Sequence, residues 1–490
     1  MEAVPRLRRA ETTRQTTNKA EGDMQTKGGV RVRSVIGKAA RSVVMGLLVA
    51  GLATGSLAAC SSGKKKHAKE SPPKAHKAAA ERERIPVLTY ERALEPDPEL
   101  ARFSVILPPP WRNRDWPVAG GSVTNAMYHV DFPRNVQLLW KRRLAHGGGM
   151  LLQVTPPVVA DGRLFLLDSR STLVAADARS GRLLWRRALK PRKEKAKIGF
   201  GGGVAVAGDL VIAATGFGEL IAFDAATGKE RWRHRGVVPL RGSPAVAGGR
   251  VFALTMDNQI IAVSLQDGQL LWTQSGLPED AALLGAATAA IAGDTAVFGL
   301  SSGELFALRA ANGQLAWQDT LSRTGRLTPL ATLADIDSFP VIDRGRVYAV
   351  SHAGRMVAID LRSGERLWEQ DVASTRTPWV AGDYIFLVTA DAEVVALSSA
   401  DGRVRWVTRL ERFADPKKRK NPVIWSGPVL AGDRLIVVSS NGFVLSLSPY
   451  TGEALSGLRT AEKIVAPPIV ADGRLYLLSN GGEVLAYGAR

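Results

Sequence analysis

The chain has 490 residues, of which 65 are lysine or arginine and 46 are aspartate or glutamate, for a formal net charge of +19. This length is enough for two or three ordinary domains. Its single cysteine excludes a disulfide within the chain and a dithiol redox pair.

Residues 1–59 predict an export signal peptide. Basic residues between Lys27 and Arg41 precede a short apolar run at 43–52, and the segment ends in small residues. This order of regions is typical of secretory signals. The apolar run is too short for a comfortable transmembrane helix. Met24 is an alternative start, because residues 1–23 add a polar extension that is unusual for such signals.

Cys60 follows Leu57-Ala58-Ala59 directly, and this pattern resembles the lipobox of bacterial lipoproteins. The resemblance implies that cleavage leaves Cys60 first, that its thiol is lipidated, and that acyl chains anchor the mature protein. The alternative is an ordinary signal peptide that contains a cysteine. Residues 60–113, rich in lysine, alanine and proline, predict a flexible tether. Binding of its lysines to anionic lipid or peptidoglycan is a secondary interpretation.

From residue 114 to residue 490 the chain repeats glycine, three residues and tryptophan. Six copies occur at spacings of about 38 to 51 residues, which indicates a repeat architecture. Each unit also carries two turn signals, such as Asp161-Gly162 and Ser180-Gly181, with short β-prone runs between them. Each unit therefore predicts four antiparallel strands, which is one blade of a propeller.

The turn signals also predict how the ring closes. Eight first turns are followed by only seven second turns, so the last unit ends at Arg490 one strand short. An isolated strand at residues 136–140 precedes the first unit, and its pairing with the C-terminal strands leaves no open edge. We predict an all-β fold: an eight-bladed β-propeller of four-stranded antiparallel blades, closed by its N- and C-terminal strands.

The repeated tryptophans are predicted to pack between neighbouring blades, with each indole N–H bound to a backbone acceptor. The alternative is a stacking platform for a planar cofactor, which would use one or two tryptophans at the ring centre. One blade has Ser456 in place of the aromatic residue. The predicted blade-docking residues are Trp140, Trp185, Trp232, Trp272, Trp317, Trp368 and Trp406.

The sequence shows no constellation of catalytic residues. Its histidines lack metal-ligand spacing, and no nucleophile elbow or phosphate-binding loop is present. We therefore predict no enzyme activity, no metal and no cofactor. Basic clusters at residues 190–197 and 412–420 fall in loops between blades; they are either solvated or bind an acidic protein or lipid surface. An exported protein is not expected to bind nucleic acid.

The pattern Asp-x-x-(Ser/Thr)-Gly-x-x-x-Trp, as in Asp177 to Trp185, resembles the repeat of pyrroloquinoline-quinone dehydrogenases and their relatives. The enzymes of that family carry an adjacent cysteine pair at the quinone and a calcium site. This chain lacks the cysteine pair. A quinone- and calcium-dependent dehydrogenase is therefore kept as an alternative function, together with a cell-wall-binding or ligand-binding propeller.

The chain is more similar to the BamB family of lipoproteins, a non-enzymatic branch of the same repeat. The resemblance covers the lipobox and the propeller and is strongest over residues 335–368. It implies a lipid-anchored scaffold of the outer-membrane β-barrel assembly (BAM) machinery at the periplasmic face of the outer membrane. Such a scaffold binds the POTRA domains of BamA and assists barrel insertion, with unfolded outer-membrane proteins as further partners.

In that family, an exposed loop with Leu-x-Leu-Arg and a neighbouring loop with Asp-x-Asp contact BamA. The matching positions here are Val238, Leu240 and Arg241, then Asp335 and Asp337, so that valine replaces the first leucine. An exposed aliphatic side chain beside an arginine also fits an interface anchor. The alternatives are that Leu240 caps a blade and that the two aspartates supply turn hydrogen bonds.

Overall fold

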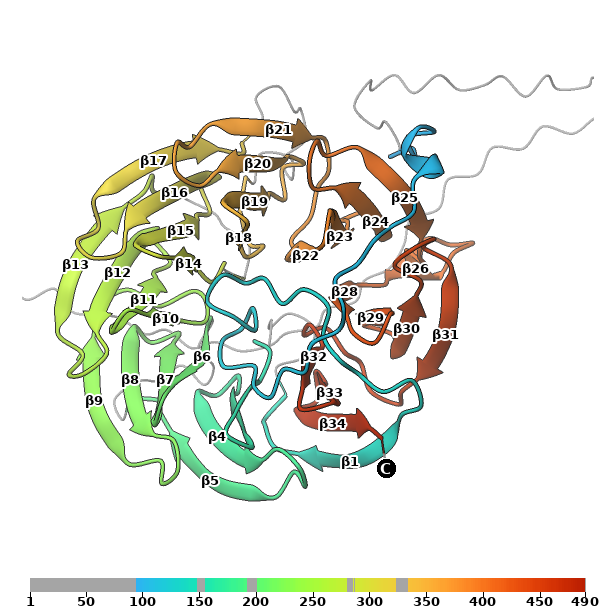
Figure 1. The fold of residues 1–490 in the computed structure, drawn as a ribbon. Helices are drawn as coiled ribbons and strands as arrows, with labels where there is room; N and C mark the ends of the chain where they lie inside the picture. Colours follow the sequence, from blue (N-terminus) through green and yellow to red (C-terminus); the bar gives the residue numbers. More distant parts are fainter. Residues whose placement is uncertain are drawn as a thin grey trace, which may run out of the picture. The chain divides into compact units, whose positions relative to one another are not determined.

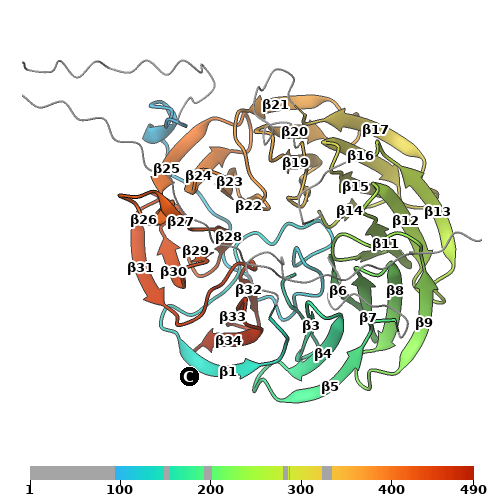
Figure 2. The same ribbon diagram turned by 180° about the vertical axis from the view of Figure 1, so that it is seen from behind.

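A computed structural model describes residues 94–147, 155–191, 201–279, 285, 287–322 and 334–489. Over these residues the chain forms eight four-stranded antiparallel sheets and one two-stranded hairpin. Figure 1 shows the eight sheets arranged around a common centre, and Figure 2 shows the same ring from behind. The predicted eight-bladed β-propeller is confirmed. Within these residues, no helix is both long and apolar enough to cross a membrane.

Each blade runs from an inner first strand to an outer fourth strand (Figure 1). The first strands are β2 (Val158–Ala160), β6 (Gly202–Ala207), β10 (Ala245–Ala247), β14 (Ala290–Ala292), β18 (Val341–Asp343), β22 (Trp379–Ala381), β28 (Trp425–Leu430) and β32 (Ile469–Ala471). The second strands are β3 (Arg163–Leu167), β7 (Leu210–Thr215), β11 (Arg250–Leu254), β15 (Thr295–Gly299), β19 (Arg346–Val350), β23 (Tyr384–Val388), β29 (Leu435–Ser439) and β33 (Arg474–Leu478). The third strands are β4 (Thr172–Asp177), β8 (Glu219–Asp224), β12 (Gln259–Ser264), β16 (Glu304–Arg309), β20 (Met356–Asp360), β24 (Glu393–Ser398), β30 (Phe443–Leu447) and β34 (Glu483–Gly488). The fourth strands are β5 (Leu183–Ala188), β9 (Glu230–Arg235), β13 (Leu270–Ser275), β17 (Leu315–Thr320), β21 (Arg366–Gln370), β25 (Val404–Arg409), β31 (Ala454–Arg459) and β1 (Gln137–Arg143).

The ring closes through strands from opposite ends of the sequence. The strand predicted at residues 136–140 is β1, which pairs antiparallel with β34. The sheet order β1-β34-β33-β32 makes β1 the outer strand of a blade whose other strands are the last three in the chain. Figure 1 shows β1 beside the C-terminus. Closure by the N- and C-terminal strands is therefore confirmed.

Each repeated tryptophan lies against a glycine of the following blade. A Cβ added to Gly268 would lie 2.5 Å from Cε3 of Trp232. The Nε1 of that indole donates to the carbonyl of Leu265, 2.8 Å away in the next blade. Five other repeated indoles donate to a backbone carbonyl in the same way, but the buried Nε1 of Trp140 has no hydrogen-bond partner among the described residues, so the prediction is wrong for that residue. The corresponding glycine contacts are Trp140 with Gly181, Trp185 with Gly228, Trp272 with Gly313, Trp317 with Gly364, Trp368 with Gly402, and Trp406 with Gly452. This geometry favours docking between blades over a cofactor platform.

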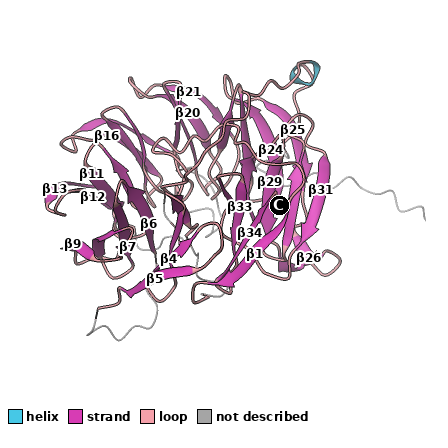
Figure 3. Cartoon of the chain, turned by 60° about the horizontal axis from the view of Figure 1, so that its bottom comes forward, coloured by secondary structure: helices cyan, strands magenta, loops and turns pink. Residues whose placement is uncertain are grey.

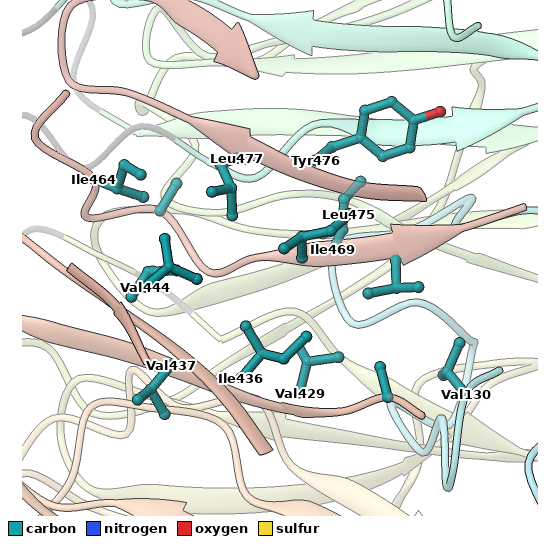
Figure 4. Packing of buried hydrophobic residues seen from close by; sticks show 14 of the residues in the cluster. Val130, Val429, Ile436, Val437, Val444, Ile464, Ile469, Leu475, Tyr476 and Leu477 are labelled. Carbon is teal, nitrogen blue, oxygen red and sulfur yellow. The ribbon is translucent and has the colours of Figure 1, made fainter. Parts of the chain in front are cut away.

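The core consists of apolar layers between neighbouring blades. Figure 4 shows one such layer, in which Val429 and Ile436 of one blade lie opposite Ile469 and Leu475 of the next. Val130, which belongs to no blade, packs at the end of this layer. All five side chains are buried, so each blade depends on its neighbours to cover its apolar faces.

Residues 105–136 form a strap across one face of the ring. Trp116 pairs with Val159 of β2, and the N–H of Ile291 in β14 donates to the carbonyl of Val123. Figure 1 shows this segment crossing the centre of the ring before it reaches β1. Because the strap bonds to the ends of inner strands in separate blades, it covers one mouth of the central channel.

Residues 94–113, which the sequence assigns to the flexible tether, contact the ring. The 3₁₀ helix η1 (Leu100–Arg102) lies against β25, and the N–H of Asp97 donates to the carbonyl of Val404 at 2.8 Å. Figure 3 shows η1 close to one end of β25. The lipidation site predicted at Cys60 lies outside the described residues.

The two faces of the ring carry different loops. Because the four strands of a blade alternate in direction, the segments that cross from one blade to the next emerge on the same face as the turns between second and third strands. We call this the crossover face. The strap lies on the opposite face, where the first strands end.

Candidate partner-binding site

The predicted contact residues Val238, Leu240 and Arg241 lie on the crossover from β9 to β10. Leu240 is 1% exposed; it packs in the layer between these two blades and bridges to Thr255. The expectation that Leu240 is an exposed anchor is therefore wrong, and the alternative, that it caps a blade, fits its position. Val238 is partly buried, whereas its neighbour Val237 is 99% exposed.

The structure brings the arginine and both predicted aspartates together. The Nη2 of Arg241 donates to Oδ1 of Asp335 at 3.2 Å and to Oδ1 of Asp337 at 3.4 Å. Its Nε donates to the carbonyl of Gly285 at 3.0 Å. All three charged side chains are buried, so their pairing fixes the crossover instead of facing solvent. Both aspartates therefore bind an arginine that lies on a different crossover, the one between β9 and β10.

Burial dominates the electrostatics of this cluster. Burial raises the pKa of Asp337 to about 6; Arg241 opposes this shift, and the neighbouring Asp335 adds to it. Burial also lowers the pKa of the Arg376 guanidinium to about 10, partly offset by Asp337. The charged form of Asp337 is therefore tolerated only because two guanidinium groups lie close to it.

A cavity of about 130 Å³ occupies the centre of the ring beside this cluster. Arg241, Asp337 and Arg376 line it, and Trp116 of the strap and Trp379 of β22 stack with ring centroids 6.2 Å apart at its wall. None of the seven repeated tryptophans lines the cavity. Among the described residues, no group of three or more His, Cys, Asp or Glu side chains is arranged to hold a metal ion.

Sequence reasoning missed the exposed valine, the second arginine and the strap. The run Gly236-Val237-Val238-Pro239 carries one usable signal, because two apolar residues between helix- and strand-breaking residues indicate an exposed turn with apolar side chains. Arg376 has no such signal, since Trp425 and Asp337, which lie close to it, are about 40 to 50 positions away in the chain.

Comparisons of the sequence with a family model and with individual proteins point to the same family. The family model for "Outer membrane protein assembly factor BamB" matches residues 130–196, 169–408 and 414–490. The chain is 31% identical to that factor from Salmonella typhimurium LT2, over 71% of this chain and 88% of the relative. It is also 31% identical to the Escherichia coli K12 protein, over 70% of this chain and 87% of the relative.

Solved structures show the same fold. BamB from Moraxella catarrhalis superposes with a TM-score of 0.61 at 21% identity, covering 72% of this chain and all of the other. A quinohemoprotein alcohol dehydrogenase from Comamonas testosteroni has the same TM-score at 15% identity, covering 78% of this chain and 82% of the other. At these identities the likeness concerns the fold alone.

Proposed function

Because this chain belongs to the family of the outer membrane protein assembly factor BamB, we propose that it is a non-enzymatic scaffold in outer-membrane protein assembly. In this proposal, lipidated Cys60 anchors it at the periplasmic face of the outer membrane, and the crossover face binds the POTRA domains of BamA. Membership in this family agrees with the prediction that the chain is not an enzyme.

The main support for the location of the binding site is an exposed valine on an immobilised loop. Val237 offers its side chain to solvent almost completely, although the residues around Arg241 are fixed by buried ion pairs. An apolar side chain on a preorganised loop loses little conformational entropy when a partner covers it. We therefore assign the contact to Val237 and Val238, and we assign a positioning role to Leu240, Arg241, Asp335 and Asp337.

Pulldown of purified BamA POTRA domains tests this proposal. Val237→Asp places a charge in the contact, and we expect at least tenfold weaker binding without loss of thermal stability. Leu455→Asp is the matched control, because Leu455 is also an exposed aliphatic residue, 54% exposed, on the outer strand of a distant blade. Full binding by Val237→Asp would reject the site, and no binding by the unmodified protein would reject the scaffold function.

A further inference from the structure

The crossover from β25 to β28 carries a hairpin that projects beside the ring. Its strands are β26 (Phe413–Asp415) and β27 (Lys420–Pro422), and Figure 2 shows them at the rim between β25 and β31. The N–H of Val423 donates to the carbonyl of Arg412 at 2.9 Å, and the Trp425 indole donates to the carbonyl of Glu411 at 2.9 Å. The base of the hairpin is therefore fixed to the blade that follows it.

The hairpin and the preceding blade enclose a groove of about 310 Å³ on the crossover face. Phe413, Pro422 and Trp425 form one apolar wall, and Val388 and Ala392 contribute to the other. Aromatic and aliphatic side chains on both sides give the groove room for an apolar side chain of a ligand.

Two arginines line the same groove. Arg376 donates its Nε to the carbonyl of Trp425 at 3.0 Å, and no carboxylate of the described residues lies within 4.0 Å of its guanidinium. Arg412 pairs with Asp391 at 2.9 Å, but both of these side chains are exposed. A surface pair of this kind contributes little energy and exchanges readily for another carboxylate.

The tip of the hairpin adds further positive charge. Residues 411–422 hold five basic and two acidic side chains, and the turn runs Lys417-Lys418-Arg419-Lys420. In the part of the chain that the structure describes, none of these four forms an ion pair, and all are exposed. Asp415 accepts the backbone N–H of Lys418 at 3.1 Å.

We propose that this groove binds an extended acidic segment of a protein partner. In this arrangement carboxylates of the segment meet Arg376, Arg412 and the basic tip. An apolar residue of the segment enters between the wall of Phe413 and Trp425 and the opposite wall of Val388 and Ala392. A planar anionic membrane fits less well, because the apolar wall and Arg376 are recessed in a groove that a flat headgroup surface does not enter. The site is separate from Val237, which lies on the crossover between β9 and β10.

Fluorescence anisotropy with a labelled decapeptide of alternating glutamate and leucine tests the groove. The protein is the full chain with Cys60→Ser, which prevents lipidation. We expect saturable binding that weakens at high salt, and no binding of the lysine–leucine decapeptide. Lys417→Glu with Lys418→Glu should weaken binding at least tenfold. Ala390→Phe should do the same by filling the groove, since Ala390 is an exposed residue of its lining.

Arg170→Glu with Lys463→Glu is the matched control. Both residues are exposed on the crossover face in other blades, and the change in net charge equals that of the hairpin variant. Equal weakening by this control would overturn the proposal, because it would reduce the effect to overall charge. Binding to phosphatidylglycerol vesicles without binding to the acidic peptide would also overturn it, in favour of a lipid contact. Peptide binding that survives Val237→Asp would show that the groove works whether or not the scaffold site does.

Discussion

At the scale of single residues, the repeated glycines serve two purposes that a substitution can separate. Gly249 and Gly268 lie in the first and third turns of one blade and have nearly the same φ, 72° and 73°. A Cβ at Gly249 would meet nothing within 4 Å, whereas one at Gly268 would collide with Trp232. The first glycine is required for its φ alone, and the second also for contact between blades.

We therefore predict unequal costs for two alanine substitutions. Gly249→Ala should destabilise by about 1 kcal/mol, the strain of a left-handed alanine. Gly268→Ala should cost about 2 kcal/mol more, because the tryptophan of the preceding blade must move. Urea denaturation of both variants measures the difference. Equal costs would contradict the role of the glycine–tryptophan contact in docking.

Asp337 gives a second residue-scale prediction, a dependence of stability on pH. Its folded pKa, about 6, lies above the ordinary value of 3.8, so the folded state binds the proton more tightly than the unfolded state. The stability associated with this group is therefore complete below pH 4 and is lost as the pH rises towards 6. The whole pKa difference between the folded and unfolded states corresponds to roughly 3 kcal/mol of unfolding free energy.

Comparison with Asp337→Asn isolates this effect. Carboxyls with a lowered pKa make the protein more stable as the pH rises. Asp224 is one of them, because hydrogen bonds from Arg231 and Thr227 hold its pKa below its usual range. These contributions are common to both proteins and cancel. We expect the free energy of unfolding of the unmodified protein, relative to the variant, to fall by about 2 kcal/mol between pH 4 and pH 7. A difference that does not change with pH would contradict the raised pKa.

At the scale of elements, the strands and their closure could be predicted but the strap could not. Turns that need φ > 0 can be recognised locally by their glycines, such as Gly268. The regular spacing of these glycines along the sequence gives the number of blades. The strap has no periodicity, since its bonds go to Val159 and Ile291 in separate blades and exist only once the ring has formed. Its position therefore depends on tertiary structure that no local pattern encodes.

The candidate site follows the same division. The sequence identified Arg241, Asp335 and Asp337 through their likeness to a family motif, and the structure places them in one buried cluster. The sequence did not indicate that Leu240 is buried, because Thr255, with which Leu240 forms a β-bridge, lies in a turn of the next blade. Burial of a loop residue depends on which blade lies beside it, whereas a motif records only the residue types.

At the scale of the whole molecule, the contact between β1 and β34 determines whether the ring is closed. It joins residues about 340 positions apart, whereas pairing within a blade joins neighbours in sequence. Arg143 pairs with Glu483 across the closure, and Thr172 pairs with Ala188 at the equivalent position of the first complete blade. These two pairs allow a matched comparison in a chain whose only natural cysteine, Cys60, is replaced by serine.

We predict that a disulfide across the closure stabilises more than one within a blade. In the chain-entropy description, Arg143→Cys with Glu483→Cys closes a loop of about 340 residues, and Thr172→Cys with Ala188→Cys closes one of about 17, a difference worth about 3 kcal/mol. Urea denaturation of each variant, oxidised and then reduced, removes the effect of the substitutions themselves. Equal gains would mean that the termini already stay together in the unfolded chain, and a loss on oxidation at the closure alone would contradict the pairing of β1 with β34.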